Sequence, residues 1–338
     1  MACMPLSNRC RLTFLIMLLS AAAAPQYLLA GDPDSDIRRM ERSGFIQPVP
    51  YPTDLNPGKV ALGDALFHDT RLSSDQTISC ASCHGLGSGG VDGVPRSFGV
   101  NATEGDINTP TVFNSGLNYS QFWDGRAATL EDQINGPINN PKEMAGSWPL
   151  AISRLKEDPD YISSFAAIYD DGINAANVRD AIATFERSLN VVDSRFDRFL
   201  RGDGSAITAE EQKGFELFKS YGCVACHQGQ NVGGNLFQKF GVMGDYFADR
   251  GDVSNADLGR FNVSGDELDR YVFKVPSLRL ATLTAPYLHD GSAKTLHEAI
   301  DVMGKYQLGR HIPSGDVELM IKFLHSLVGS YKGQPLDD

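Results

Sequence analysis

Ile78-Ser79-Cys80-Ala81-Ser82-Cys83-His84 and Tyr221-Gly222-Cys223-Val224-Ala225-Cys226-His227 are the two stretches that decide how this chain folds. Each contains Cys-x-x-Cys-His, the attachment pattern of a c-type haem. The two thiols can both reach the vinyl groups on one edge of a porphyrin, and the histidine after them can ligate the iron from one face. The sequence therefore predicts two covalently bound haem c groups. The cofactor-binding residues predicted in this way are Cys80, Cys83, His84, Cys223, Cys226 and His227.

Two other uses of paired cysteines fit the sequence less well. A zinc ribbon places its two Cys-x-x-Cys pairs about 15–20 residues apart, whereas the pairs here begin 143 positions apart, at Cys80 and Cys223. A thioredoxin-like pair needs no histidine after its second cysteine, and both pairs here have one. The repeat of the whole pattern favours haem.

The first thirty residues have the features of an export signal. Arg9 and Arg11 precede an apolar run from Leu12 to Ala24, and small residues follow up to Ala30. This arrangement predicts a signal peptide over residues 1–30, cleaved after Ala30, and hence a periplasmic protein. An uncleaved membrane anchor is the alternative, although the apolar run is short for a spanning helix.

The cysteine count and the charge of the mature chain follow from this cleavage. The six cysteines minus Cys3 and Cys10 leave four, all in the two pentads, so no cysteine is free for a disulfide. The 30 lysines and arginines minus Arg9 and Arg11 leave 28, against 42 aspartates and glutamates, a net charge of −14. Such an acidic chain argues against nucleic acid as a partner.

Each pentad lies between two segments of helical character, so the sequence contains the same helix–pentad–helix unit twice. Gly63-Asp64-Ala65-Leu66-Phe67 precedes the first pentad and Gly214-Phe215-Glu216-Leu217-Phe218 precedes the second. Apolar residues at helical spacing follow later, over 178–189 and over 317–327. The plan predicts a mainly α-helical chain with little β-structure, made of two cytochrome c-like domains in tandem. In each domain, a glycine of the first helix is expected to let it approach the last helix closely.

The predicted boundaries follow from proline, glycine and capping signals. A proline-rich N-terminal arm is expected over 31–58, the first haem domain over 59–200 and the second over 201–338. Thr208 and Glu211 form a capping box that opens the first helix of the second domain. The glycine-rich loops after the pentads, 85–105 and 229–251, are expected to be irregular and to wrap the haem faces.

The first iron site is predicted to be open or weakly closed. No histidine occurs between His84 and His227, Met144 is the only methionine in that interval, and His68 lies upstream. An open ferric haem with one histidine behind it can bind peroxide. Cleavage of the peroxide then requires a neighbouring group that moves a proton from one oxygen to the other.

The second iron site has a candidate axial methionine. Met303 stands in the segment that leads into the closing helix, where a cytochrome c carries its axial methionine. Met320 lies on the apolar stripe of that helix, and Met243 could serve either as a ligand or in the core. Ligation by a thioether raises the potential of a haem, which would make the second site an electron reservoir.

Further stretches resemble the bacterial di-haem cytochrome c peroxidases over nearly the whole mature chain. These stretches are Asn108–Asn114, Gln121–Arg126, Gly136-Pro137, Glu143-Met144, Leu283–Tyr287, Met303-Gly304 and Phe323–Leu327. The resemblance implies reduction of hydrogen peroxide to water at an open first haem. The electrons would come from a small periplasmic c-type cytochrome or cupredoxin and enter at the second haem. The oligomeric state stays open, with a homodimer as one option.

The resemblance also implies roles for individual side chains. Glu143 is expected to be the acid–base group beside the first haem, with Gln133 in the same distal pocket and Met144 as a packing neighbour. Trp123 is expected between the haems, on the electron path. Taken alone, a carboxylate such as Glu143 is more often solvated at the surface, and a tryptophan such as Trp123 is a common core residue.

A calcium ion between the two domains is a further implication of the resemblance. Its ligands would be the side chain of Asn108 and the carbonyl oxygens of Thr284 and Pro286. Oxygen ligands of this kind suit calcium. His289 matches a family position near the second haem, where it would serve as a supporting or a structural residue.

One departure from the family pattern leaves rival functions open. Many members carry a histidine that blocks the resting first iron, and the corresponding segment here, 97–102, has none. A sister branch that oxidises residues on a partner protein also lacks it, and agrees at Pro137. That branch ligates its second haem with tyrosine, so Tyr306 competes with Met303 for the role. A third hypothesis is a plain electron carrier in which both irons are six-coordinate.

Overall fold

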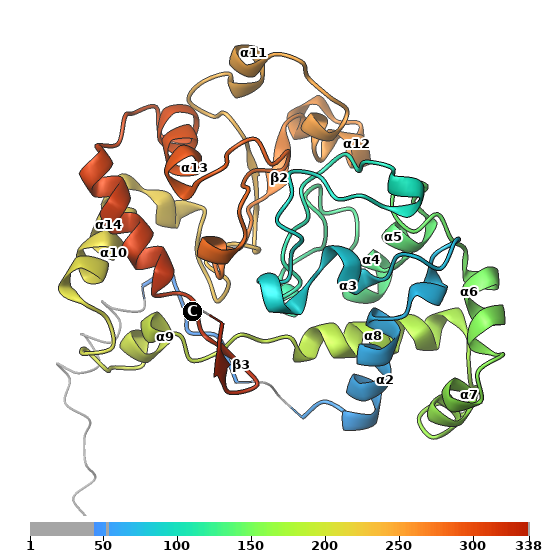
Figure 1. The fold of residues 1–338 in the computed structure, drawn as a ribbon. Helices are drawn as coiled ribbons and strands as arrows, with labels where there is room; N and C mark the ends of the chain where they lie inside the picture. Colours follow the sequence, from blue (N-terminus) through green and yellow to red (C-terminus); the bar gives the residue numbers. More distant parts are fainter. Residues whose placement is uncertain (1–43, 52–53, 337–338) are drawn as a thin grey trace, which may run out of the picture.

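The computed structural model describes residues 44–51 and 54–336, so the predicted signal peptide and most of the predicted N-terminal arm lie outside the described residues. Helices dominate this part of the chain, and the prediction of a mainly α-helical protein with little β-structure is confirmed (Figure 1). The helices are α2 (Pro57–Phe67), α3 (Cys80–Cys83), α4 (Leu130–Gln133), α5 (Asn135–Asn139), α6 (Trp148–Leu155), α7 (Pro159–Ala166), α8 (Ala175–Ser188), α9 (Arg195–Leu200), α10 (Ala209–Tyr221), α11 (Tyr246–Arg250), α12 (Phe261–Ser264), α13 (Leu296–Val302) and α14 (Ser314–His325). The short strands are β1 (Phe237–Lys239), β2 (Val272–Lys274), β3 (Ser330–Tyr331) and β4 (Gln334–Pro335), which form the antiparallel pairs β1–β2 and β3–β4.

The helices that open the two halves begin at side-chain caps. Asn56 Oδ1 accepts hydrogen bonds from the backbone N–H groups of Gly58 and Lys59 at the start of α2. At the start of α10, Glu211 N donates to Thr208 Oγ1 at 3.2 Å and Thr208 N donates to Glu211 Oε2 at 2.8 Å. This reciprocal pair is the predicted capping box.

Two close helix crossings organise the fold. A Cβ atom built on Gly63 of α2 would lie 2.0 Å from the carbonyl oxygen of Ala181 in α8. A Cβ atom on Gly214 of α10 would lie 2.0 Å from the carbonyl oxygen of Leu319 in α14. Figure 1 shows the α10–α14 pair on the left and the α2–α8 pair at the lower right. The predicted close approach through a glycine is thus present in both halves.

Each crossing lies within its own apolar core. The first core is built largely from α2 and α8 with the segments between them, and includes Phe67, Phe165 and Phe185. The second core is built around α10 and α14 and includes Phe215 and Phe323. A smaller aromatic cluster packs near the β1–β2 pair, and its buried members are Phe240, Tyr246, Phe247, Phe273 and Tyr306.

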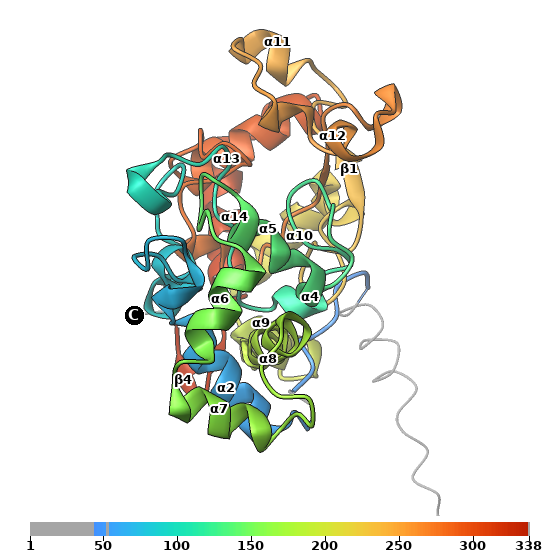
Figure 2. The same cartoon turned by 90° about the vertical axis from the view of Figure 1, so that its right-hand side faces the viewer.

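The C-terminal strand pair returns to the first core. Ser330 N donates to Val192 O at 2.8 Å, and the ring of Tyr331 packs edge-on against Phe113 with centroids 5.2 Å apart. A buried ion pair fixes α9 within the second half, with Arg279 Nη2 2.8 Å from Asp197 Oδ1. Figure 2, turned by 90° from Figure 1, shows α11 and α12 at the top of the molecule and α2 and α7 at the bottom.

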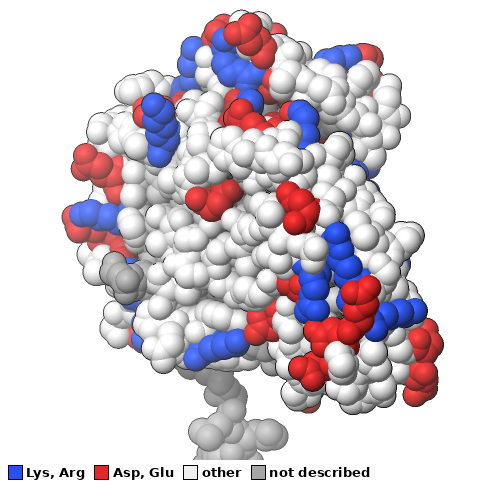
Figure 3. All heavy atoms as spheres, turned by 45° about the vertical axis from the view of Figure 1, so that its right-hand side comes forward, with Lys and Arg blue, Asp and Glu red and all other residues white. Residues whose placement is uncertain are grey.

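The surface carries small mixed groups of charge. In the face drawn in Figure 3, acidic and basic side chains gather toward the edges, and few charged side chains lie in the middle. No helix among the described residues is both long enough and apolar enough to cross a membrane.

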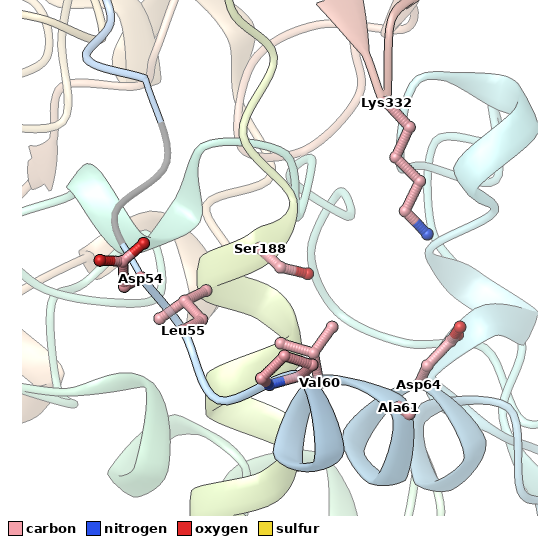
Figure 4. A pocket seen from close by; sticks show the side chains of 8 residues that line it. Asp54, Leu55, Val60, Ala61, Asp64, Ser188 and Lys332 are labelled. Atoms are coloured by element: carbon pink, nitrogen blue, oxygen red, sulfur yellow. The ribbon is translucent and has the colours of Figure 1, made fainter.

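An open surface hollow of about 530 Å³ lies between the start of α2, the end of α8 and the β3–β4 turn. Figure 4 shows Lys332 and Asp64 facing each other across this hollow. No pentad residue lines it, so it lies apart from the predicted haem chemistry.

Replacing Gly214 with alanine is expected to destabilise the protein by about 1–3 kcal/mol, because the added methyl group must push two backbones apart. Urea denaturation measures the loss. The matched control is Gly315→Ala at the start of α14, where an added Cβ meets nothing within 4 Å. If Gly214→Ala proves as stable as Gly315→Ala, the close crossing is not a constraint on the fold.

Candidate haem sites

The first pentad forms one short helical turn. Ser79 N donates to Ser82 Oγ at 3.0 Å at the start of α3, and His84 follows the last residue of this helix. His84 Nδ1 lies 3.2 Å from Gly90 O, which holds the imidazole ring by a backbone carbonyl. Because Nδ1 is used in this bond, Nε2 is the nitrogen left to ligate an iron.

The second pentad repeats this arrangement. Gly222, with φ +93°, ends α10, and a 3-10 turn over Cys223–Ala225 carries the chain to His227. His227 Nδ1 lies 3.3 Å from Val232 O, again leaving Nε2 free. Burial lowers the pKa of His84 and lowers that of His227 to about 4. Both rings are therefore neutral at pH 7, as ligation of iron requires.

A cavity of about 430 Å³ adjoins the second pentad. Cys223, Cys226 and His227 line one part of it, and Met303 lines another part. Most of the remaining lining residues are apolar, and they come from both halves of the chain, from Pro110 and Phe113 in the first to Leu324 in the second. None of the four pentad cysteines forms a disulfide bond. A thiol pair, a neutral imidazole and an apolar cavity fit a covalent haem c.

Met303 lines this cavity, as its predicted role of axial ligand requires. It begins a π-helical turn over Met303–Gln307 that follows α13 directly. Met243 is 62% exposed. Met320 also lines the cavity, from the buried face of α14.

Tyr306 is held by other partners. Its hydroxyl group donates to Asp249 Oδ2 at 2.9 Å and accepts from Lys305 Nζ at 2.8 Å. Its ring packs in the aromatic cluster around Tyr246, with centroids 5.1 Å apart. Tyr306 does not line the cavity, whereas Met303 does. The arrangement favours a thioether over a phenolate at the second iron.

Trp123 and the three predicted calcium ligands line the same cavity. Trp123 Nε1 donates to the carbonyl oxygen of Asn108 at 2.9 Å. The Nδ2 of Asn108 donates to Val94 O and Pro95 O, which leaves Oδ1 as the atom available to a cation. Together with the carbonyl groups of Thr284 and Pro286, which line the same cavity, this is an oxygen donor set of the kind that suits calcium.

His289 belongs to a buried ion-pair network beside Trp123. His289 Nε2 lies 2.7 Å from Asp257 Oδ1, and its ring centroid lies 6.4 Å from that of Trp123. Arg250 pairs with both Asp257 and Asp290 at 2.6 Å. Burial alone would raise the pKa of Asp257, but the hydrogen bonds from His289 and Arg250 lower it. Because these groups satisfy one another, the network supports the wall of the cavity and needs no metal.

Glu143 lies in the first half, away from this cavity. Asn140 Nδ2 donates to its Oε1 at 2.6 Å. Burial raises the pKa of Glu143, although the bond from Asn140 and the nearby charge of Arg126 act in the opposite direction. A raised pKa favours the protonated form of this carboxyl group, which can then donate a proton.

The segment that lacks the blocking histidine packs directly on Glu143. Val100 N donates to Glu143 O at 2.8 Å, and a Cβ atom on Gly99 would lie 2.3 Å from the same oxygen. The Val100 side chain is buried and offers no ligand atom. Met144 is buried in the first core, as expected of a packing neighbour. Gln133 is half-buried at the last position of α4.

Comparison with known proteins identifies the family. A model of the di-haem cytochrome c peroxidases matches residues 57–205. The chain is 42% identical over 318 residues to a cytochrome c551 peroxidase of Nitrosomonas europaea, covering 94% of this chain and 92% of that protein. The chain belongs to the di-haem cytochrome c peroxidase family. It is therefore a member of an enzyme family.

Two further proteins show the same similarity. The chain is 48% identical over 298 residues to the cytochrome c peroxidase Ccp of Escherichia coli, covering 88% of this chain but only 64% of the longer relative. The fold matches a solved MauG-like protein associated with microbial copper homeostasis with a TM-score of 0.74 and 29% identity, covering 84% of this chain and 93% of that one.

Two buried charged residues of this peroxidase-family chain were not anticipated from the sequence. Lys274 of β2 lines the cavity, and burial lowers its pKa to about 8. Glu186 of α8 is 6% exposed and its Oε2 lacks a hydrogen-bond partner among the described residues. Burial raises the pKa of Glu186 to about 8. The negative charge of Glu186, in turn, contributes to the raised pKa of the Cys80 thiol. Neither Lys274 nor Glu186 belongs to a sequence motif. Each has a shifted pKa only because the fold buries it.

Replacing Met303 with leucine is expected to lower the potential of the second haem, because the thioether ligand that raises it is lost. A spectroscopic redox titration of the full protein measures the effect. Met243→Leu, a change at an exposed site, is the control and should leave the potential unchanged. An unchanged potential in Met303→Leu removes Met303 as the ligand.

Replacing Glu186 with glutamine is expected to stabilise the protein by about 2–4 kcal/mol at pH 8 and to change little at pH 4. Between the ordinary pKa of a glutamate and about 8, the unfolded chain loses this proton while the folded chain keeps it. Stability therefore falls as the pH rises through this range, and the glutamine removes that loss. Urea denaturation at the two pH values measures the difference.

The control for this experiment is Glu131→Gln. Burial opposes the ionisation of Glu131, but the hydrogen bond from Arg187 lowers its pKa overall. Its replacement should therefore reduce stability at pH 8, which is the opposite sign. Equal pH profiles for wild type and Glu186→Gln would show that Glu186 is ionised in the folded protein.

Proposed function

We propose that this chain is a periplasmic di-haem cytochrome c peroxidase, in which hydrogen peroxide, two electrons and two protons give two molecules of water. When bound, the two haem c groups supply electron storage and the iron site at which the peroxide bond is broken. The two predicted domains, 59–200 and 201–338, would each be cytochrome c-like. Each would hold one haem at its pentad. His84 and His227 would ligate the irons, with Met303 completing the second.

The observation that carries this proposal is the packing of the 97–102 segment against Glu143. A buried valine side chain stands in that segment, and the backbone bond from Val100 fixes the carboxylate-bearing turn. The first iron would therefore keep an open face beside Glu143. Glu143, whose pKa is raised, would take a proton from the near oxygen of the peroxide and return it to the leaving oxygen. Gln133 would orient the substrate in the same pocket.

Electrons would enter at the second site from a small periplasmic c-type cytochrome or cupredoxin. Trp123 supports the onward route, because it lines the second cavity while its indole N–H is bonded to Asn108. A calcium ion held by Asn108, Thr284 and Pro286 would fix this junction between the halves. The protein could work as a monomer or as a homodimer.

The second candidate function is oxidation of residues on a partner protein. The absent loop histidine and the fold of the MauG-like protein favour it. The engagement of Tyr306 with Asp249 and Lys305 argues against it, since a thioether at Met303 keeps the ferrous state accessible to a soluble donor. A plain electron carrier is the third candidate, and it would not react with peroxide.

Replacing Glu143 with glutamine is expected to reduce peroxide turnover by a factor of about 10²–10⁴, the usual contribution of a positioned acid–base group. Turnover is measured with a reduced small c-type cytochrome as donor, and haem content by absorbance. The control is Glu104→Gln, a change at an exposed glutamate of the neighbouring loop. A fully active Glu143→Gln enzyme would refute the acid–base role. Slow turnover already in the wild type, with rapid reaction toward a protein substrate, would favour the second candidate.

A further inference from the structure

The loop 121–127 presents Phe122 and Arg126 as a stacked pair. Gln121 N donates to Ala127 O at 2.8 Å and closes the loop. Within the loop, the guanidinium carbon of Arg126 lies 3.4 Å from the centroid of the Phe122 ring. A guanidinium group this close to an aromatic face makes a cation–π contact and stacks through its plane. The proposed function gives neither of these two side chains a role.

The surroundings of Phe122 fix the position of its ring. Phe122 has φ +69°, a left-handed conformation that a bulky residue adopts only where the structure around it determines it. A Cβ atom on Gly136 would lie 2.6 Å from the ring carbon Cζ, so the ring packs directly against the start of α5. The ring therefore touches Arg126 on its face and the backbone of α5 at its tip.

Helix α5 carries this contact on to Glu143. Asn140, the residue after α5, donates its backbone N–H to Gly136 O at 2.9 Å and accepts from Glu143 N at 3.0 Å. Its side-chain Nδ2 donates to Glu143 Oε1 at 2.6 Å. The position of the Glu143 carboxyl group thus depends on the same turn of backbone against which the Phe122 ring packs.

Arg126 also acts on Glu143 through its charge. Burial raises the pKa of Glu143, and the positive charge of Arg126 opposes this rise. Arg126 Nη1 lies 2.9 Å from Asp124 Oδ2, so Asp124 holds the guanidinium group in place and offsets part of its charge. The other ionisable groups around Glu143 belong to Asp106, Lys142, Cys80 and Cys83.

These other groups do not duplicate the charge of Arg126. Asp106 acts in the opposite direction and raises the pKa of Glu143, and Lys142 Nζ pairs with Asp106 Oδ1 at 2.6 Å. Burial raises the pKa of the Cys80 thiol to about 12 and also raises that of Cys83, so both sulfur groups are neutral at pH 7.

We propose that Arg126 is a positioning residue for the acid–base chemistry of Glu143, because it holds the Phe122 ring against the turn that carries this carboxyl group and favours the ionised form of the group. The inference rests on the proposed function, in which Glu143 first takes a proton from peroxide and must therefore start ionised. Without the cation the carboxyl group keeps its proton to a higher pH. A lysine at this position supplies the charge but not the planar stacking.

The test measures kcat/KM for peroxide against pH, using the full protein with both haems and a reduced small c-type cytochrome as donor. In Arg126→Gln we expect the acid limb, where activity rises with pH, to move up by about 0.5–1 pH unit. This is less than for a buried ion pair, because Arg126 is exposed to solvent. Arg126→Lys should leave the limb in place and lower the activity equally at every pH.

Two further variants separate this effect from a general loss of stability. Arg270→Gln is the matched control, because Arg270 lies 4.2 Å from the Phe261 ring and pairs with Glu267 at 2.6 Å, and it should keep the wild-type profile. Asp124→Asn leaves the charge of Arg126 unpaired and should move the limb to lower pH. Because its sign is opposite, this variant carries the test if Arg126→Gln does not fold.

Infrared difference spectra titrate the Glu143 carboxyl group directly, with Glu143→Gln identifying its band, and should show the same shifts without turnover. A titration that Arg126→Gln and Asp124→Asn both leave unmoved would overturn the inference. So would an equal loss of activity at every pH in Arg126→Gln and Arg126→Lys, since only packing would then be lost. A fully active Glu143→Gln protein would instead refute the acid–base role on which the inference rests.

Discussion

The hydrogen bond from each proximal imidazole to a backbone carbonyl is the constraint on which the two sites depend. In both halves the histidine follows a helical turn, and the carbonyl comes from the loop five or six positions further on. That bond selects which nitrogen faces the iron and fixes the plane of the ring. The close crossing at Gly214 brings together α10 and α14, which both line the cavity, and the crossing at Gly63 joins α2 and α8 in the same way.

The two halves share this frame but differ in their other candidate site residues. The second cavity places a methionine at its wall and keeps the competing tyrosine engaged elsewhere. The first half offers a buried carboxyl group with a raised pKa and a loop whose buried side chain is a valine. In the proposed function, the second half would store electrons and the first would assist proton transfer. This asymmetry is the physical basis of the proposed peroxidase activity.

The features that the sequence predicted are those set by local pattern. The helix crossings, the capping box at Thr208 and the placement of Met303 all follow from spacing within one segment. The burial of Lys274 and of Glu186 could not be predicted in this way, because each depends on which distant segment covers the residue. The return of the C-terminal strands to the first core is of the same kind, since Ser330 pairs with a residue of the segment that follows α8.

The central claim is that one iron keeps a vacant face while the other is capped by sulfur. Electron paramagnetic resonance of the fully oxidised protein, before and after addition of hydrogen peroxide, tests this claim most directly. The account predicts one high-spin and one low-spin ferric signal, of which the high-spin signal responds at once to the peroxide. Two low-spin signals that stay unchanged by peroxide at every redox level would contradict it.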